Sequence, residues 1–313
     1  MSIIQTVGLE FGMKGFLRLR TRNKFSGKII QDTNWFPNTI LDSGRNNMSV
    51  EANWLLSCQV GTDGTAPSQS DTALLGHVAG TSNIVSVTSG NAPTAPYYGW
   101  KRLTYRFDAG TVAANLNEAG IGWGETGSTL ISRARILDPV LQIPTTITPL
   151  IDELLEVLYE IQYYPPLVDV VLPQVTLDGV VYDTITRASG VTDPTWSASI
   201  GLKIGVVTDY RYWDAWDGTL GTILLAPNGN SADCDTSNQY NSSYSNNSYE
   251  QQVNCPVGSQ GWNLGSGIRS VRIRTTAGDY QTQFTAASGG ATIPKSVAYN
   301  MLMSWKLAWV EKV

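Results

Sequence analysis

The sequence predicts an all-β protein, mainly antiparallel, with two tandem β-sandwich-like domains, long loops and little helix. Three observations lead to this prediction. The chain of 313 residues is rich in Gly, Ser, Thr, Asn, Tyr and Trp and only 15% charged, which suits sheets and loops better than helices. Two segments alternate apolar and polar residues, one before Pro165 and one near the C-terminus. Each follows an Ile-Pro pair and a spacer, which indicates an internal repeat.

The segment before Pro165 predicts the closing strand of a first domain. Its apolar set is Leu155, Val157, Tyr159, Ile161 and Tyr163, its polar set is Glu156, Glu160 and Gln162, and Leu158 is the exception. Alternation places the two sets on opposite faces of a strand. A helix is the alternative, because leucines in this run also fit a 3.6-residue period. The aromatic and β-branched end of the run and the double proline Pro165-Pro166 favour the strand.

The C-terminal segment repeats this arrangement. Its alternating residues are Met303, Trp305, Leu307 and Trp309 on one face and Ser304, Lys306 and Ala308 on the other. Ile293-Pro294 precedes it as Ile143-Pro144 precedes the first segment, and a short strand-like piece lies before each pair. We therefore predict two related β-domains, 1–166 and 167–313, each finished by its own closing strand. The alternative is that two amphipathic strands look alike without any duplication.

The first domain is expected to be a series of strands joined by turns. Residues 7–30 predict two short strands with a turn at 24–27, and a short helix is expected within 44–56. The other predicted elements are 32–41, 54–60, 98–107, 115–123 and 130–136. Glu118, beside two glycines, is either a buried carboxylate that accepts backbone hydrogen bonds or a surface residue at a strand start. The surface position is the commoner one.

The second domain begins again with strands. These are expected at 168–172, 175–186 and 200–207, and again from 268 to the C-terminus. The pair Asp178-Gly179 is the clearest hairpin turn in the chain, because Asp-Gly adopts the backbone that a two-residue turn needs.

Two stretches of the second domain predict an exposed binding surface. Residues 209–217 place aromatic rings among aspartates, and residues 228–254 are biased to Asn, Ser, Gln and Tyr, too polar to build a core. Exposed rings provide contact area while Asn, Ser and Asp adapt their hydrogen bonds. The candidate binding residues are Tyr210, Tyr212, Trp213, Asp214, Trp216, Asp217, Tyr240, Tyr244 and Tyr249.

The net charge of -5 provides no basic surface for nucleic acid. No apolar run approaches the ~20 residues of a membrane-spanning helix, so membrane insertion is not expected. The first residues lack the basic start and apolar stretch of a secretory signal, which predicts synthesis in a cytoplasm. Cys58 is expected to be a small buried hydrophobe. Cys234 and Cys255 flank the polar insert and are the candidate disulfide pair, although cytoplasmic assembly argues against the bridge.

The sequence predicts no catalytic residue, metal site or cofactor. His77 is the single histidine, which excludes two-histidine metal sites and weakens any catalytic triad. Asp214 and Asp217 are the carboxylate pair that a glycosidase would need, but an acidic, aromatic loop without catalysis is the commoner case. The aspartates between 209 and 217 lack the ordered spacing of a calcium loop.

Several segments of the first half resemble a family of structural proteins from tailed bacteriophages, described as tail-fibre, baseplate-associated or virion structural proteins. The matching residues are Trp35-Phe36-Pro37-Asn38, Ile40-Leu41-Asp42-Ser43-Gly44, Cys58-Gln59-Val60-Gly61-Thr62, Pro67, Asp71-Thr72-Ala73-Leu74, Tyr105-Arg106-Phe107, Asn115-Leu116, Glu118-Ala119-Gly120-Ile121-Gly122 and Ser132-Arg133-Ala134. The similarity covers about residues 10–166 and returns weakly in the final strands. Residues 210–261 look particular to this chain.

The resemblance implies a virion protein of the tail tip, baseplate or fibre, assembled in the host cytoplasm from several copies and other virion proteins. It transfers no catalytic residue. A head-to-tail ring or trimer is the expected assembly. The first domain would dock on the particle, and the second would present residues 209–254 to a host-surface glycan or protein. The alternatives are a collar, neck or capsid-decorating protein without a receptor role, and a tail-associated glycan hydrolase.

Overall fold

The computed structural model describes residues 6–177, 179–204, 213–233, 239–258, 261–290, 292–295 and 300–312. Strands dominate it, and its two helices within these ranges are short, with six residues in α1 (Asp42–Asn47) and four in α2 (Thr195–Ala198). The prediction of an all-β, mainly antiparallel fold with little helix is confirmed. The helix expected within 44–56 is shorter than predicted and begins earlier.

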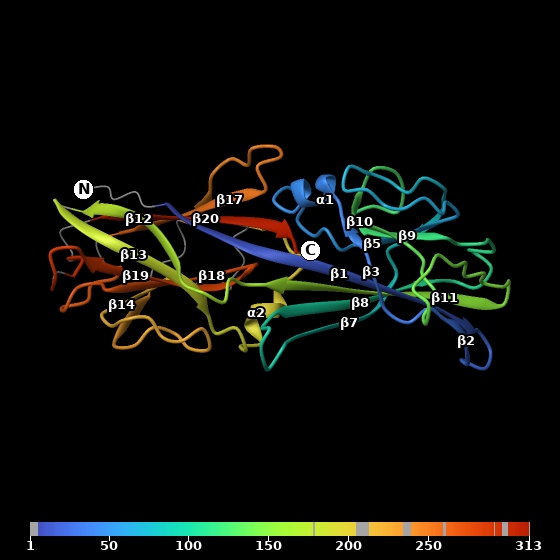
Figure 1. Ribbon diagram of the computed structural model, residues 1–313, viewed down its shortest axis with the longest axis horizontal. Helices are drawn as coiled ribbons and strands as arrows, with labels where there is room; N and C mark the ends of the chain where they lie inside the picture. Colours follow the sequence, from blue (N-terminus) through green and yellow to red (C-terminus); the bar gives the residue numbers. More distant parts are fainter. Residues whose placement is uncertain are drawn as a thin grey trace.

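A long sheet joins the two ends of the chain. Its strands are β1 (Thr6–Asn23), β2 (Ile29–Asp32), β3 (Phe36–Pro37), β7 (Ile84–Asn91), β8 (Gly99–Phe107), β11 (Glu153–Tyr164), β16 (Tyr240–Asn241), β17 (Glu250–Val257) and β20 (Met301–Glu311). The order is β16-β17-β20-β1-β11-β8-β7, and β2 and β3 pair with β1 beside this path. In Figure 1 this sheet runs along the length of the molecule.

Two smaller sheets complete the fold. A five-stranded sheet has the order β4-β10-β9-β5-β6, and a six-stranded sheet has the order β12-β13-β19-β18-β14-β15. The first contains β4 (Thr39–Ile40), β5 (Ser57–Gly61), β6 (His77–Thr81), β9 (Glu118–Gly122) and β10 (Leu130–Arg135). The second contains β12 (Val170–Leu177), β13 (Val180–Ser189), β14 (Trp213–Trp216), β15 (Ser231–Asp233), β18 (Ser270–Thr275) and β19 (Gly278–Ala286). Figure 1 shows them at opposite ends of the molecule.

β1 connects the two halves of the chain. Its first residues pair in parallel with β20, and residues 12–23 pair antiparallel with β11. The two predicted closing strands therefore flank the same N-terminal strand, and the shared sheet crosses the expected domain boundary at residue 166. β1 is also longer than the short strand that we expected there.

The alternation in β11 and β20 is confirmed as strand, so the helical alternative for residues 155–161 is wrong. Leu155, Val157, Tyr159 and Ile161 are all buried, as are Trp305 and Trp309. The polar face of β11 is also covered, which the pattern did not predict. Glu156 is buried because Arg20, Arg22 and Arg106 all form ion pairs with its carboxylate.

Part of the expected long exposed loop at 228–254 is regular structure, so that prediction is only partly right. Residues 250–254 belong to β17, which pairs with β20 inside the long sheet, and Val253 is fully buried. Pairing with β20 provides hydrogen-bond partners for the backbone N–H and C=O groups of residues 250–254. A segment with few aliphatic side chains can therefore form a strand here. The hairpin between β12 and β13 is confirmed, with Leu177 paired to Val180 and Gly179 at positive φ.

One core cluster extends through all three sheets. Its largest side chains are aromatic, and six tryptophans are fully buried: Trp54, Trp196, Trp213, Trp262, Trp305 and Trp309. Trp196 in α2 packs between β8 and β19, where Gly99 and Gly278 leave space for its ring. The long and six-stranded sheets are therefore joined by packing as well as by the chain.

Candidate functional site

Trp213 was expected to be exposed on a binding surface, and this is wrong. It is fully buried in β14, with its ring centroid 6.4 Å from that of Trp262 and 6.2 Å from that of Trp305. The Trp262 indole N–H donates to the Trp213 carbonyl (3.3 Å). The alternation of β14 turns this ring into the core, where large aromatic surfaces are most stabilising.

Asp214 is likewise buried rather than exposed. Its Oδ2 accepts a hydrogen bond from Arg272 Nε (2.9 Å), and Asp233 lies opposite it on β15. Burial raises the pKa of Asp214, while the Arg272 guanidinium acts in the opposite direction. Arg272 serves as its structural counter-ion.

Trp216 and Asp217 lie at the end of β14. Trp216 is half-buried, with the Arg272 guanidinium 5.6 Å from its ring centroid. Asp217 accepts hydrogen bonds from Asn230 Nδ2 (2.9 Å), the Asn230 backbone N–H (2.8 Å) and Ser266 Oγ (2.8 Å), which lower its pKa. Asp214 and Asp217 thus each have partners of their own and hold different parts of the fold together.

The three tyrosines of the polar insert have different environments. Tyr240 is 49% exposed. Tyr244 stacks on Trp309 (6.2 Å between centroids) and donates its hydroxyl to Asn46 Oδ1 (2.9 Å). The Tyr249 ring lies 4.1 Å from the Arg45 guanidinium. Tyr244 and Tyr249 therefore attach the insert to α1 and its surroundings. Tyr240 is the most exposed of these three tyrosines and the most accessible to a partner.

Three of the candidate site residues lie outside the described residues: Tyr210, Tyr212 and Cys234. The structure therefore does not test whether Cys234 pairs with Cys255. Asp178 of the predicted hairpin turn also lies outside them. Cys255 is buried in β17, and Cys58 is buried as predicted, with its pKa raised by burial.

A second buried acid lies near Arg272, on β19. Asp279 is opposite Arg274, with 3.3 Å between Arg274 Nε and Asp279 Oδ2. Burial raises the pKa of Asp279 to about 7, and Asp193 and Asp214 add to the effect, whereas Arg274 and Arg272 oppose it. The folded protein therefore favours the neutral acid more strongly than the unfolded chain does.

We expect Asp279→Asn to remove a pH dependence of stability. A carboxyl whose pKa is raised on folding contributes most below its unfolded pKa, and this contribution falls as pH rises through the folded value. Here the window runs from about 4 to about 7, with a slope of up to about 1.4 kcal/mol per pH unit. Urea unfolding of both proteins should show the variant gaining on wild type as pH rises. Parallel pH profiles would contradict the burial of an ionisable Asp279.

A charged cluster in the five-stranded sheet, one arginine with three acidic side chains, was missed by the sequence analysis. Arg133 is 1% exposed and donates to Glu118 Oε2 (2.7 Å) and Asp71 Oδ2 (2.7 Å), with Asp63 at 3.5 Å. Glu118 is fully buried and accepts the Gly76 backbone N–H (2.7 Å). The surface position favoured for Glu118 is therefore wrong, and the buried carboxylate is right.

Two glycines make close packing possible around this cluster and beside it. A Cβ on Gly61 would lie 2.5 Å from Glu118 Oε1, and a Cβ on Gly44 would overlap the backbone of Ile131. Gly61, with Arg133, Glu118 and Asp71, lets residues 62–76 pack against the five-stranded sheet, and Gly44 lets α1 pack against β10. Their role is packing and charge compensation. Glu118 and Arg133 are 15 residues apart in the chain, and no pattern of neighbouring residues indicates that they pair. Predicting this ion pair requires knowing how the residues of β9 and β10 align across the sheet.

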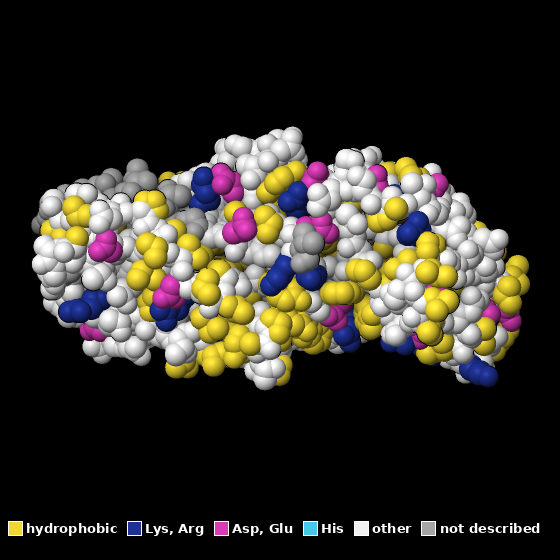
Figure 2. Space-filling model, in the orientation of Figure 1, with side chains coloured by type: hydrophobic (Ala, Val, Ile, Leu, Met, Phe, Trp, Pro, Cys, Tyr) yellow, Lys and Arg dark blue, Asp and Glu magenta, His cyan; other side chains and the backbone are white. Residues whose placement is uncertain are grey.

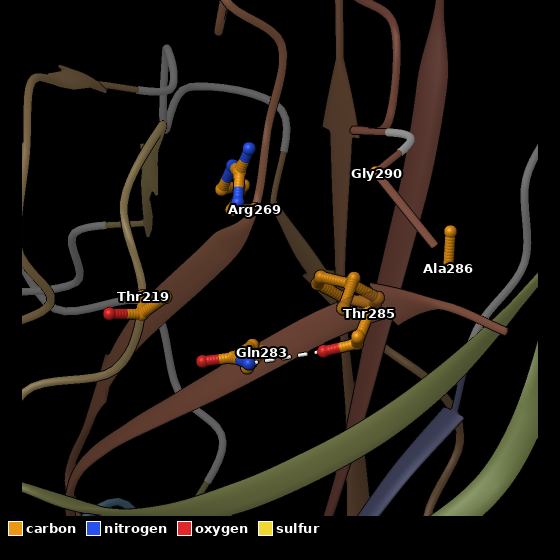
Figure 3. A pocket seen from close by; sticks show the side chains of 7 residues that line it. Thr219, Arg269, Gln283, Thr285, Ala286 and Gly290 are labelled. Carbon is orange, nitrogen blue, oxygen red and sulfur yellow. Dashed lines mark hydrogen bonds between the residues drawn. The ribbon is translucent and has the colours of Figure 1, made fainter. Parts of the chain in front are cut away.

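A shallow hollow of about 100 Å³ lies beside the end of β14. Its lining residues come from the loop after β14, the residue before β18, the end of β19 and the loop that follows β19: Thr219, Arg269, Gln283, Phe284, Thr285, Ala286 and Gly290. The Arg269 backbone N–H donates to the Trp216 carbonyl (2.8 Å), which places the hollow next to the predicted binding segment. Figure 3 shows Gln283 hydrogen-bonded to Thr285 on one side, with Arg269 separate from both.

The described residues contain no group of three or more His, Cys, Asp and Glu side chains placed to hold a metal ion. None of the helices in these ranges has the length and apolar composition needed to span a membrane. Comparisons with protein-family models, curated proteins and solved structures gave no match to this chain.

Proposed function

We propose that the chain is a structural protein of a bacteriophage virion, located in the tail tip, baseplate or fibre. It assembles through contacts with its own copies and with other virion proteins, and contributes to binding of a host-surface glycan or protein. The support comes from an all-β fold of low charge, from the family resemblance of the first half, and above all from exposed apolar side chains at one end of the molecule.

This apolar end is formed by Phe25, Ile29, Ile30, Leu150 and Ile151. Phe25 is 81% exposed and Ile151 is 76% exposed. The Lys24 backbone N–H donates to the Asp152 carbonyl (3.0 Å), so the β1–β2 turn and the start of β11 lie together. Figure 2 shows hydrophobic side chains at the end where Figure 1 draws β2. Large exposed apolar groups that lie together are typical of surfaces that become buried in an assembly.

A second apolar strip lies at the opposite half of the molecule. β12 is the edge strand of the six-stranded sheet, and Val171 on it is 77% exposed. Val168, just before this strand, is 73% exposed. Edge strands with apolar side chains are sites where another chain can add, although Pro173 limits strand pairing here. Two separate apolar surfaces suit a subunit with two neighbours, as in a ring or trimer.

We expect the double variant Phe25→Ser/Ile151→Ser to weaken assembly without unfolding the protein. Both side chains are exposed, so their loss removes contact area from an interface and little from the core. Light scattering after size-exclusion chromatography would measure the oligomer, with Val50→Ser, 51% exposed beside α1, as the matched control. An unchanged oligomer in the double variant would contradict an interface at the apolar end.

Labelling of phage particles with an antibody to this chain tests the location in the virion. Label at the tail supports the proposal. Label at the head or neck would favour the alternative of a collar, neck or capsid-decorating protein without a receptor role, and unlabelled particles would remove the virion assignment.

A tail-associated glycan hydrolase is the less favoured alternative. It would use Asp214 and Asp217, which the structure holds by Arg272 on one side and by Asn230 and Ser266 on the other. Sugar release from host envelope polysaccharide by wild type, lost in Asp214→Asn, would support it. No release by either protein would exclude this pair as the catalytic acids.

A further inference from the structure

Arg269 differs from the other arginines of the described residues. Each of the others has an acidic or carbonyl partner: Arg18, Arg20, Arg22, Arg45, Arg102, Arg106, Arg133, Arg135, Arg187, Arg272 and Arg274. The Arg269 side chain is exposed, and it donates to no acceptor in the part of the chain that the structure describes. Its guanidinium is therefore available to a ligand.

The position of Arg269 is nevertheless well defined. Its backbone N–H donates to the Trp216 carbonyl and its carbonyl accepts the Phe284 N–H, both at 2.8 Å. These bonds attach the start of β18 to β14 on one side and to β19 on the other. A cation on such a scaffold loses less backbone freedom on binding than one on an unpaired loop.

The hollow beside Arg269 presents hydrogen-bond donors. Thr219 contributes a hydroxyl that has no protein partner among the described residues. Gln283 Nε2 donates to Thr285 Oγ1 (3.0 Å), which leaves the Thr285 O–H and the second Gln283 N–H free to donate. Gln283 is held in turn because its Oε1 accepts the Leu220 backbone N–H (3.1 Å).

Among the residues that the structure describes, no carboxylate lines this hollow. Asp217, close in sequence to Thr219, has its oxygens occupied by Asn230 and Ser266. A guanidinium with several neutral donors and no acid beside it is the chemistry that binds a small oxyanion, a carboxylate or a phosphate. The volume of about 100 Å³ suits one such group.

We propose that the hollow around Arg269 binds the carboxylate of an acidic sugar. The hydroxyl and amide groups of Thr219, Gln283 and Thr285 suit the adjacent hydroxyls of a sugar ring. The space at Gly290 is open, because a Cβ there would meet no atom within 4 Å. This inference deepens the proposed host-surface binding by giving it a ligand class. The chemistry of the site does not depend on the chain being a virion protein. The binding experiment and the location of the chain in the virion can therefore fail independently of each other.

The test compares methyl glucuronide with methyl glucoside, which differ only at C6, a carboxylate in the first and a hydroxymethyl group in the second. Inorganic phosphate is the third probe. Chemical-shift changes in NMR spectra of the full chain would report binding. We expect the glucuronide to bind and the glucoside to bind at least about tenfold more weakly, since a hydrogen bond to a charged group is among the stronger polar contacts. Added salt should weaken glucuronide binding because the site is exposed.

Two variants locate the site. Arg269→Gln should reduce glucuronide affinity about tenfold or more, and Thr219→Val should reduce it by a smaller factor. Arg135→Gln is the matched control, because Arg135 lines a different hollow with Asn117 and Thr146. Equal binding of glucuronide and glucoside, or full binding by Arg269→Gln, would overturn the proposal. Binding of phosphate without glucuronide would overturn the assignment to a sugar carboxylate.

Discussion

Replacing Arg133 by methionine is expected to lower the free energy of unfolding by about 3–5 kcal/mol, because it leaves a buried charge without its partner. Glu118 would keep its burial and its bond from the Gly76 N–H but lose the guanidinium 2.7 Å away. Asp71 would lose its 2.7 Å contact as well, which releases residues 62–76 from the five-stranded sheet. Urea unfolding monitored by tryptophan fluorescence measures the loss.

The controls separate charge compensation from loss of volume. Glu118→Gln/Arg133→Met removes both charges and should cost less than Arg133→Met alone, because an apolar side chain beside a neutral amide leaves no buried ion. Arg135→Met, two residues along the same strand, removes an arginine whose hydrogen-bond partner among the described residues is the Gly64 carbonyl at 3.4 Å. If Arg133→Met were as mild as Arg135→Met, the cluster would not stabilise the fold as described.

Replacing Trp196 by alanine is expected to cost about 3–5 kcal/mol, the range for removing a large buried aromatic side chain. Trp196 is 1% exposed, and α2 contacts β7 and β8 of the long sheet and β19 of the six-stranded sheet. The cavity would therefore open between two sheets and cannot be filled by a rearrangement within either one. Thermal unfolding should shift to lower temperature and become less cooperative, because part of the packing that joins the two sheets is lost while the Trp213–Trp305 contact remains.

Trp35→Ala is the matched control for Trp196→Ala. Trp35 is half-buried, and the Arg102 guanidinium lies 5.0 Å from its ring centroid. Its removal should therefore lower the free energy of unfolding clearly less than the removal of Trp196. Gly278→Ala tests the same joint from the other side, because a Cβ there would overlap the Trp196 indole and Gly278 has φ +109°. A cost for Trp196→Ala no larger than for Trp35→Ala would contradict the role of Trp196 at the joint.

Local patterns predicted much of the fold. Composition and period-two alternation indicated an all-β chain. They also placed the strands β11 and β20 correctly, because the burial of every second side chain shows in the order of neighbouring residues. The β12–β13 hairpin was equally predictable, since the sequence places a glycine at position 179, where the backbone has a positive φ. The buried Cys58 followed from its apolar surroundings in sequence.

The candidate site was much less predictable. Trp213 and Asp214 looked exposed because their segment is acidic and aromatic, yet β14 turns Trp213 toward Trp262 and Trp305 and pairs Asp214 with Arg272. The hollow at Arg269 is formed by residues from three separate elements, and no single stretch of sequence contains it.

The sequence by itself determined the β-rich class, the two long alternating strands and the hairpin, because each depends on residues close together in the chain. Only the tertiary structure decided that β1 would join β11 to β20, that Arg133 would neutralise Glu118, and that Arg269 would lie beside a hollow with no acceptor among the described residues. The physical reason is that charge pairing and burial depend on strand register across distant segments, and a register shift of one residue reverses which face a side chain occupies.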